Sequence, residues 1–220
     1  MSLNKVLITG SSGGLGYHLT EFFLKKGYPV IIHGRDEKKI ISIVENFTNE
    51  GFNIEYFICD LNNENDIYSL SEFCKSKDVK ILINNAGVIC PSLEFKKITN
   101  DVINQMIKVN LIAPISLINF LQYQLEQVIN INSMVGKEPK ASRTIYAASK
   151  WGLRGFSDSL KKENVDYNIL DVYPTNIKTW PERENAMDIN FVLEMIYNAM
   201  LENKKELVLD GRKNDFKGKD

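Results

Sequence analysis

Histidine and cysteine are scarce in this chain. Its 220 residues include two histidines, His18 and His33, and three cysteines, Cys59, Cys74 and Cys90. Two histidines are few for a histidine metal site or for a Ser/His/Asp hydrolase. We expect both histidines to be partly exposed. The cysteines are odd in number and have no paired spacing, so we expect neither a metal site nor a disulfide framework. A reducing cytoplasm fits such a chain.

Strong charge and long apolar runs are also missing. The formal net charge is -1, which gives no electrostatic reason to expect nucleic acid or an anionic membrane as a partner. The N-terminal residues do not contain a basic stretch followed by a long hydrophobic run. We therefore expect no signal peptide and no membrane span. A 44% hydrophobic, 25% charged composition over 220 residues is typical of one globular domain, residues 1–220. Residues 211–220 predict a solvated polar tail.

Short β-branched runs alternate with longer stretches of helical periodicity. Several runs are almost wholly apolar, as expected for strands covered on both faces. Helical spacing is clearest over residues 17–27 and 100–124, with Asn100 as the expected N-cap of the second helix. Repeated strand and helix predict an α/β fold, a doubly wound parallel sheet of about seven strands with helices on both faces. The predicted strands cover residues 5–9, 29–33, 54–59, 79–84, 127–132, 167–173 and 206–210.

A glycine-rich turn, TGSSGGLG, follows the first predicted strand and opens a helix. Glycine adopts the backbone angles of a tight turn at little cost, and missing side chains let a diphosphate approach the amides of a helix N-terminus. The turn therefore predicts dinucleotide binding in a Rossmann-type sheet. Its spacing stays open: Gly10, Gly14 and Gly16 fit one known pattern, and Gly10, Gly13 and Gly16 fit another.

The end of the second predicted strand bears on the choice of dinucleotide. In such folds an acidic residue there holds the adenosine ribose, whereas a basic residue accommodates a 2′-phosphate. This strand ends in His33-Gly34-Arg35, with lysines at 38 and 39, so NADP(H) is favoured over NAD(H). Alternatively Arg35 faces solvent, and the nearby Asp36 weakens the assignment. Asp60, which closes the third strand, is a candidate for the adenine edge.

Five motifs in order give the chain a family resemblance. They are the glycine turn, NNAG at 84–87, Asn110 in KVNL, Ser133 after the fifth strand, and Tyr146 four residues before Lys150. From about residue 5 to Thr179 the chain resembles the short-chain dehydrogenase/reductases. The resemblance implies a homo-oligomeric NAD(P)(H) oxidoreductase that acts on a small carbonyl or alcohol, without a metal. It implies a catalytic set of Asn110, Ser133, Tyr146 and Lys150.

The residue types of this set suit carbonyl reduction. Hydride arrival at a carbonyl carbon builds negative charge on oxygen, which Tyr146 would neutralise by donating a proton. Lys150 lies one helical turn further on the same face, and a unit charge about 4 Å away at an effective dielectric near 20 is worth roughly 4 kcal/mol. We therefore expect Lys150 to lower the phenol pKa. Ser133 would orient the substrate oxygen, and the family uses Asn110 to kink its helix and hold a relay water.

The resemblance also implies which residues contact the cofactor. These are Gly10, Ser12, Gly14, Leu15, Gly16, Arg35, Asp60, Leu61, Asn85, Ala86, Gly87, Tyr146, Lys150, Pro174, Ile177 and Thr179.

The chain departs from the family after the sixth strand. Thr175 follows Pro174 where the family commonly has glycine, so a side chain replaces bare backbone near the nicotinamide. The substrate segment, about 175–190, is short and predicts a shallow, open pocket. Its apolar wall could come from Trp180, Met134, Val135 and Tyr173, although each could instead be core. Lys137, Lys140 and Arg143 could attract an anionic substrate or simply form a solvated surface.

Three functions remain open at this stage. The first is an NADPH-dependent carbonyl reductase, reversible as an alcohol dehydrogenase. The second is a sugar-nucleotide epimerase-like enzyme, against which the absence of a C-terminal substrate domain counts. The third is an NADP(H)-binding sensor or scaffold with little turnover. The family also predicts homodimers or homotetramers through helices around 100–125 and 145–163.

Overall fold

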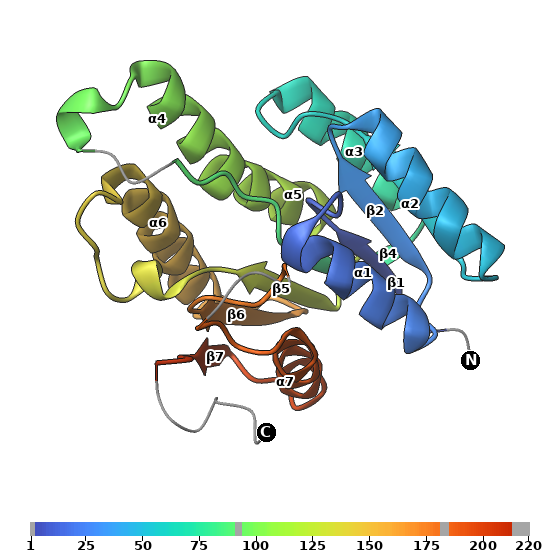
Figure 1. The fold of residues 1–220 in the computed structure, drawn as a ribbon. Coiled ribbons are helices and arrows are strands. Elements are labelled where there is room, and N and C mark those ends of the chain that lie inside the picture. The colour runs from blue at the N-terminus through green and yellow to red at the C-terminus, as the bar shows by residue number, and fades with distance from the viewer. Residues whose placement is uncertain (1–2, 91–93, 181–184, 213–220) are drawn as a thin grey trace.

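The protein is built around one seven-stranded sheet (Figure 1). A computed structural model describes residues 3–90, 94–180 and 185–212. Every neighbouring pair of strands is parallel, in the order β3-β2-β1-β4-β5-β6-β7. The prediction of a doubly wound sheet is confirmed, with all seven strands within about a residue of their expected places. The strands are β1 (Lys5–Ile8), β2 (Val30–Gly34), β3 (Ile54–Ile58), β4 (Val79–Asn84), β5 (Gln127–Ile131), β6 (Asn168–Pro174) and β7 (Glu206–Leu209).

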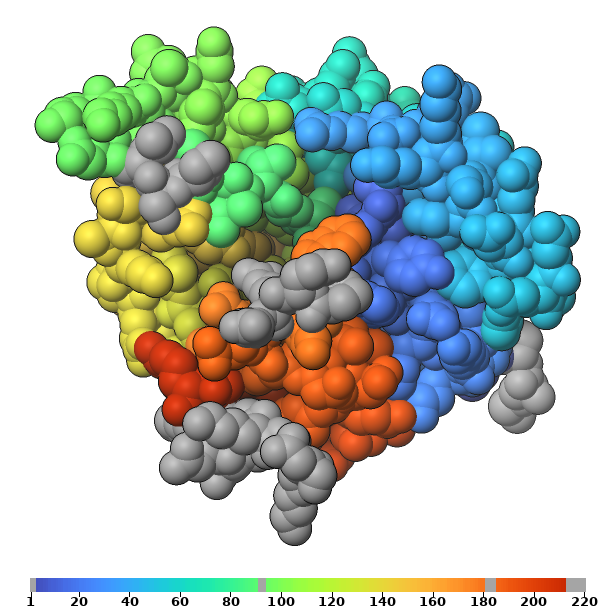
Figure 2. Space-filling model, in the orientation of Figure 1, coloured from blue at the N-terminus to red at the C-terminus, as the bar shows by residue number. Residues whose placement is uncertain are grey.

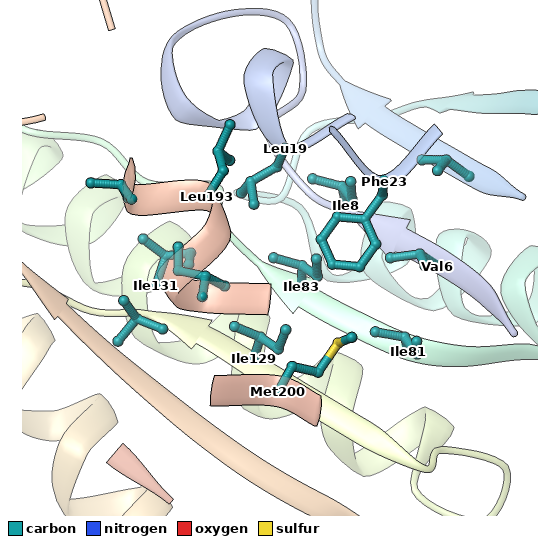
Figure 3. Close-up of a cluster of buried hydrophobic side chains, with 14 of the residues drawn as sticks. Val6, Ile8, Leu19, Phe23, Ile81, Ile83, Ile129, Ile131, Leu193 and Met200 are labelled. Atoms are coloured by element: carbon teal, nitrogen blue, oxygen red, sulfur yellow. The ribbon is translucent and has the colours of Figure 1, made fainter. Parts of the chain in front are cut away.

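Helices cover both faces of the sheet. Alternate residues of each strand point to opposite faces, so Val6 and Ile8 join one core and Leu7 the other. The first core lies under α1, α2 and α7, and Figure 3 shows Leu19, Phe23, Leu193 and Met200 of these helices against the strand side chains. The second core lies under α3, α5 and α6. The helices are α1 (Gly14–Lys25), α2 (Glu37–Asn49), α3 (Glu64–Ser76), α4 (Asn100–Ile107), α5 (Ala113–Leu121), α6 (Thr144–Leu160) and α7 (Ile189–Leu201).

The predicted helix over 100–124 forms with two differences. Its N-cap is Thr99, whose hydroxyl accepts a hydrogen bond from the Val102 N–H at 3.4 Å, so the expectation for Asn100 is wrong by one residue. Between α4 and α5 the residues Lys108–Ile112 form a π-helical turn. Such turns occur frequently at functional sites, and this one contains Asn110.

The same helical stretch bears on the expectation that no segment spans a membrane. Within the described residues, Asn100–Leu121 alone has the length and apolar composition that a membrane crossing needs. In this fold its α5 half packs against α3 and its α4 half against α6. Only 39% of its apolar window is buried inside the chain, so a large part of its surface faces outward.

The strand order creates the place for a site. Chain connections run outward from β1 toward β3 and, on the other side, from β4 toward β7. The crossovers therefore leave in opposite directions between β1 and β4. In open parallel sheets a crevice forms at the carboxyl ends of the strands at such a switch point.

Candidate active site

The glycine turn lies at this switch point, and its geometry decides between the two spacings. Gly10 and Gly14 have positive φ angles of 69° and 55°, which favour glycine. A Cβ on Gly16 would lie 2.2 Å from the Gly10 carbonyl oxygen. Gly13 has an extended backbone, and a Cβ there would lie 3.8 Å from the Trp180 ring, an ordinary contact. The structure therefore requires glycine at 10 and 16, favours it at 14, and tolerates a side chain at 13.

The start of α1 provides donors for an anion. No side chain caps this helix, so the first backbone N–H groups of α1 have no capping acceptor. They adjoin a cleft of about 370 Å³, and Figure 2 shows the surface hollowed between the blue N-terminal residues and the green segment that follows β4. A diphosphate fits such a helix terminus, and the glycine turn leaves its backbone uncovered. The cleft is lined by Gly10, Ser12, Gly13, Leu15, His33, Gly34, Arg35, Cys59, Asp60, Leu61, Asn85, Ala86, Gly87, Val88 and Val109.

His33 is buried in the floor of this cleft, so the expectation of partial exposure holds for His18 only. The ring accepts a hydrogen bond from the Gly10 N–H at Nδ1 (3.3 Å), and its Nε2–H donates to the Cys59 carbonyl at 3.2 Å. Burial lowers the pKa of His33 to about 4. A neutral imidazole thus ties the glycine turn to the end of β3, and its two backbone partners make burial tolerable.

The turn after β4 is fastened to β1. The Thr9 hydroxyl accepts hydrogen bonds from the Asn85 and Ala86 N–H groups, both at 3.0 Å, and donates to the Ile83 carbonyl at 3.3 Å. The Asn85 amide donates back to the Thr9 carbonyl at 2.8 Å. A Cβ on Gly10 would lie 2.8 Å from the Ala86 Cα. NNAG and the glycine turn therefore form one rigid rim of the cleft.

At the outer end of the cleft the end of β2 carries no acidic side chain, and Ile40 packs closely against Gly34. A Cβ on Gly34 would lie 2.8 Å from the Ile40 Cδ1. Arg35 is exposed beside this position. The Asp36 carboxylate caps α2 by accepting from the Lys39 N–H at 3.2 Å, and it pairs with the Lys39 ammonium at 3.6 Å. Asp36 is therefore engaged locally, away from Arg35.

Asn110 is buried and binds the loop after β4. Its Oδ1 accepts from the Val88 N–H at 2.7 Å, and its Nδ2 donates to the Val88 carbonyl at 2.8 Å and to the Ser149 hydroxyl at 3.3 Å. A solvent-facing asparagine is excluded. The π turn thus connects the cofactor rim to α6, which carries Tyr146 and Lys150.

Tyr146, Lys150 and Ser133 converge beside the cleft. The Lys150 ammonium lies 5.8 Å from the centre of the Tyr146 ring and donates to the Ile131 carbonyl at 2.9 Å. Complete burial lowers the pKa of Lys150 to about 8. The Ser133 hydroxyl lies near the phenol and acts to lower its pKa.

The pKa of Tyr146 differs from expectation. Burial raises it above its ordinary value of 10.0, against smaller lowering effects of the Ser133 hydrogen bond and the Arg143 guanidinium. The expected lowering by Lys150 is therefore wrong for this structure. Lys150 itself is desolvated, and its polar contact is directed to backbone rather than to the phenol.

Asn132 is a site residue that the sequence analysis missed. Its buried Oδ1 accepts from the Ser133 N–H at 2.9 Å, and its Nδ2 donates to the Lys150 carbonyl at 3.1 Å. One carboxamide thus joins the end of β5 to the turn of α6 that carries Lys150. The only signal was an asparagine in an otherwise apolar strand end, QVININ.

A second cavity of about 490 Å³ opens on the Tyr146 side. Ser133, Met134 and Val135 line it, whereas Tyr173 is core. Lys140 and Arg143 also line it, and the Arg143 guanidinium donates to the Cys90 carbonyl at 2.5 Å. Lys137 instead pairs with Glu206 at 2.7 Å.

The remaining predicted cofactor residues are spread around these cavities. Pro174 lines the second cavity, and Ile177 is buried core. Gly14 and Thr179 line an adjoining pocket of about 420 Å³, together with Trp180. Trp180 therefore lies by the glycine turn rather than in the Tyr146 pocket. Residues 181–184 of the predicted substrate segment lie outside the described residues.

Comparison with known proteins agrees with this geometry. A sequence model of the family described as short chain dehydrogenase matches residues 4–188. Nodulation protein G of Rhizobium sp. (strain N33) is 31% identical over 172 residues, 75% of this chain and 69% of that protein. A 3-oxoacyl-(acyl-carrier-protein) reductase of Chlamydia pneumoniae is 30% identical over the same shares of each chain.

Solved structures show the same fold. A short-chain dehydrogenase from Sphingobium yanoikuyae in complex with NADPH superposes with a TM-score of 0.85 at 24% identity, covering 96% of this chain and 89% of that one. The glycine turn, the Tyr146 and Lys150 pair and the match over residues 4–188 lead to one conclusion. The chain belongs to the short-chain dehydrogenase family, NAD(P)-dependent oxidoreductases that act on CH–OH and C=O groups.

Proposed function

We propose that this protein catalyses the reversible NADPH-dependent reduction of an aldehyde or ketone to an alcohol. The observation that carries the proposal is the convergence of Tyr146, Ser133 and Lys150 between the dinucleotide cleft and the second cavity. A carbonyl in that cavity would meet a hydroxyl pair on one side and the cofactor cleft on the other. The carbonyl reductase therefore takes precedence over the epimerase-like alternative.

Bound NADPH would supply the hydride, and the protein's own residues manage the proton. Tyr146 donates its phenol proton to the oxygen on which charge develops, and its raised pKa keeps the proton in place at neutral pH. Ser133 holds the same oxygen by hydrogen bonding. Lys150 places a buried cation 5.8 Å from the centre of the Tyr146 ring, so it contributes positive charge to the site while its ammonium is held by the Ile131 carbonyl. Asn110 positions the loop after β4 through its two bonds to Val88.

NADPH is the proposed cofactor because of the end of β2. Gly34 stands where an acidic residue would hold the adenosine ribose, and Arg35 is exposed beside the cleft. Two lysines, at positions 38 and 39, line the adjoining pocket together with Ser12. Their ammonium groups provide positive charge for a 2′-phosphate. The related Sphingobium structure holds NADPH, which supports the same choice.

Activity is tested by screening aldehydes, ketones and quinones for NADPH oxidation. Tyr146→Phe should lower kcat by about 10²- to 10⁴-fold and leave NADPH binding intact, because only the proton donor is removed. Tyr123→Phe is the matched control, since Tyr123 is 96% exposed. Tight NADPH binding without turnover across the panel, unchanged in Tyr146→Phe, would instead favour the sensor or scaffold.

Cofactor choice is tested by fluorescence titration of NADPH and NADH. Arg35→Ala should weaken NADPH binding by about tenfold or more and leave NADH unchanged, because a hydrogen bond to a charged group contributes about 1.5–3 kcal/mol. Lys204→Ala removes an exposed charge paired with Glu202 and serves as the control. Equal affinity for both cofactors, unaffected by Arg35→Ala, would refute the assignment.

We further propose that the protein is a homodimer or homotetramer. Ile112 and Trp151 are large apolar side chains that are exposed on the helices predicted to form the interface. Light scattering that gives a monomer would contradict this. The three free cysteines suit a reducing compartment, and we propose the cytoplasm.

A further inference from the structure

Thr175, the residue that replaces the family's glycine, holds the end of β7. Its hydroxyl accepts a hydrogen bond from the Gly211 N–H at 2.9 Å and donates to the Leu209 carbonyl at 3.3 Å. Its backbone N–H also donates to the Leu209 carbonyl at 2.9 Å. Glycine at 175 would keep the backbone bond but would leave the Gly211 N–H without this acceptor.

Gly211 has no space for a side chain. A Cβ placed there would lie 2.6 Å from the Met187 Cγ and 3.3 Å from the Thr175 Oγ1. The Met187 N–H in turn donates to the Asn176 carbonyl at 2.9 Å. The chain after β7 is therefore confined between the turn after β6 and Met187.

Arg212 connects this segment to the loop that follows Ser133. Its guanidinium contacts both Asp210 oxygens, at 2.7 Å from Nε and 2.8 Å from Nη2, and donates from Nη1 to the Glu138 carboxylate at 2.8 Å. Figure 2 shows the red C-terminal segment between the yellow and orange segments. Arg212, in the predicted solvated tail over 211–220, is exposed but held by these two carboxylates. Residues 213–220 lie outside the described residues.

All parts of this arrangement face the second cavity. Thr175, Gly211, Arg212 and Glu138 line it together with Tyr146. We infer that Thr175 is a positioning residue that fastens Asp210–Arg212 as a wall of the substrate pocket, and that the Arg212 and Glu138 pair limits the size of the ketone admitted. This inference rests on the proposed carbonyl reduction at Tyr146.

The wall opens when the Gly211 N–H loses its acceptor. Thr175→Val preserves the shape of the side chain and removes only the hydroxyl. A single hydrogen bond changes an opening equilibrium by a factor of about three to ten. Thr175→Ser retains the hydroxyl and is the rescue variant, and Thr48→Val, on the exposed face of α2, is the matched control.

The first experiment measures hydrogen exchange in the peptide that covers residues 206–212. Thr175→Val should speed exchange of the Gly211 amide by about three- to tenfold, whereas Thr175→Ser and Thr48→Val should match the unmodified protein. Equal exchange in all four proteins overturns the inference. This readout needs no turnover, so it decides the role of Thr175 even if carbonyl reduction itself fails.

The second experiment compares butanone with benzophenone as small and bulky ketones. Arg212→Ala and Glu138→Gln should each raise the ratio of kcat/KM for benzophenone to that for butanone by about threefold or more. Thr175→Val should raise KM for butanone more than it lowers kcat, with rescue by Thr175→Ser. An active protein whose ratio and KM are unchanged in these variants refutes the pocket wall. No turnover of either ketone by the unmodified protein counts against the proposed function, and hydrogen exchange then decides the inference.

Discussion

Replacing Lys150 by methionine should stabilise the protein while abolishing its activity. The Lys150 side chain is buried in α6, and its ammonium has one backbone acceptor, the Ile131 carbonyl. Burial lowers the pKa of Lys150 from its ordinary 10.5 to about 8. Folding at neutral pH therefore forces a charged group out of water, and methionine fills similar space without this cost.

The size of the effect follows from the pKa difference. A shift of one pKa unit corresponds to about 1.4 kcal/mol, so the charged lysine costs the folded state about 3 kcal/mol near pH 7. Between the folded and unfolded pKa values the unfolded state binds more protons, so this cost fades as pH rises from about 8 to about 10.5. The free energy of unfolding therefore rises at alkaline pH, where Lys150 is neutral in both states, and falls again as pH drops toward about 8.

Urea unfolding of both proteins at about pH 7 and about pH 10 measures the effect. The free energy gained by Lys150→Met should shrink by about 2 to 3 kcal/mol between these conditions. The unpaired Ile131 carbonyl costs the variant about 1–3 kcal/mol at either pH, so it cancels from the difference. Tyrosines and cysteines that titrate above neutrality and lie far from Lys150 cancel in the same way. A gain in stability that is independent of pH would refute the assignment of a buried, charged Lys150.

Three further predictions concern the rest of the framework. Lys161→Met should destabilise folding by about 3–5 kcal/mol in urea, because it strands the Asp171 carboxylate, fully buried in β6 and raised in pKa by burial, and the loss should diminish at acidic pH as Asp171 protonates. Gly16→Ala should weaken NADPH binding by more than tenfold in fluorescence titration, because its Cβ would overlap the Gly10 carbonyl, whereas Gly155→Ala on the open face of α6 should bind NADPH normally. Asn132→Ala should lower kcat about tenfold with little change in NADPH affinity, because the carboxamide that connects Ser133 to Lys150 is lost.

Each of these has a contrary result. A Lys161→Met protein whose stability loss is the same at acidic and neutral pH would show that Asp171 is not the stranded charge. Normal NADPH binding by Gly16→Ala would mean that the glycine turn relaxes freely. Equal falls in kcat and in NADPH affinity for Asn132→Ala would indicate general damage to the fold.

Regular elements were predicted well because they depend on local patterns. The seven strands are β-branched runs that can be recognised from their own residues, and their number and alternation with helices fix a parallel, doubly wound sheet. The helix start at Thr99 was missed by one residue because Asn100 and Thr99 are both good caps, and only backbone geometry chooses between them. The exact glycine spacing also required coordinates, since it depends on φ angles and on the Gly10 carbonyl.

The errors concern polar groups whose environment is made by distant residues. His33 is buried because partners at positions 10 and 59 satisfy its ring. Tyr146 has a raised pKa because of its burial, which no local spacing reveals. Arg212 is exposed, as the predicted tail implies, but its pairing with Glu138, 74 residues earlier in the chain, has no local signal in the sequence.

By itself, the sequence determined the sheet, the glycine turn and the presence of a tyrosine one helical turn before a lysine, because periodicity and spacing along a chain are local properties. The tertiary structure was needed to show which groups are desolvated, how Asn132 joins Ser133 to Lys150, and that Gly211 and Arg212, just after β7, line the cavity beside Tyr146. Burial and hydrogen bonding depend on atoms brought together from remote segments, and these set the pKa values and the shape of the site.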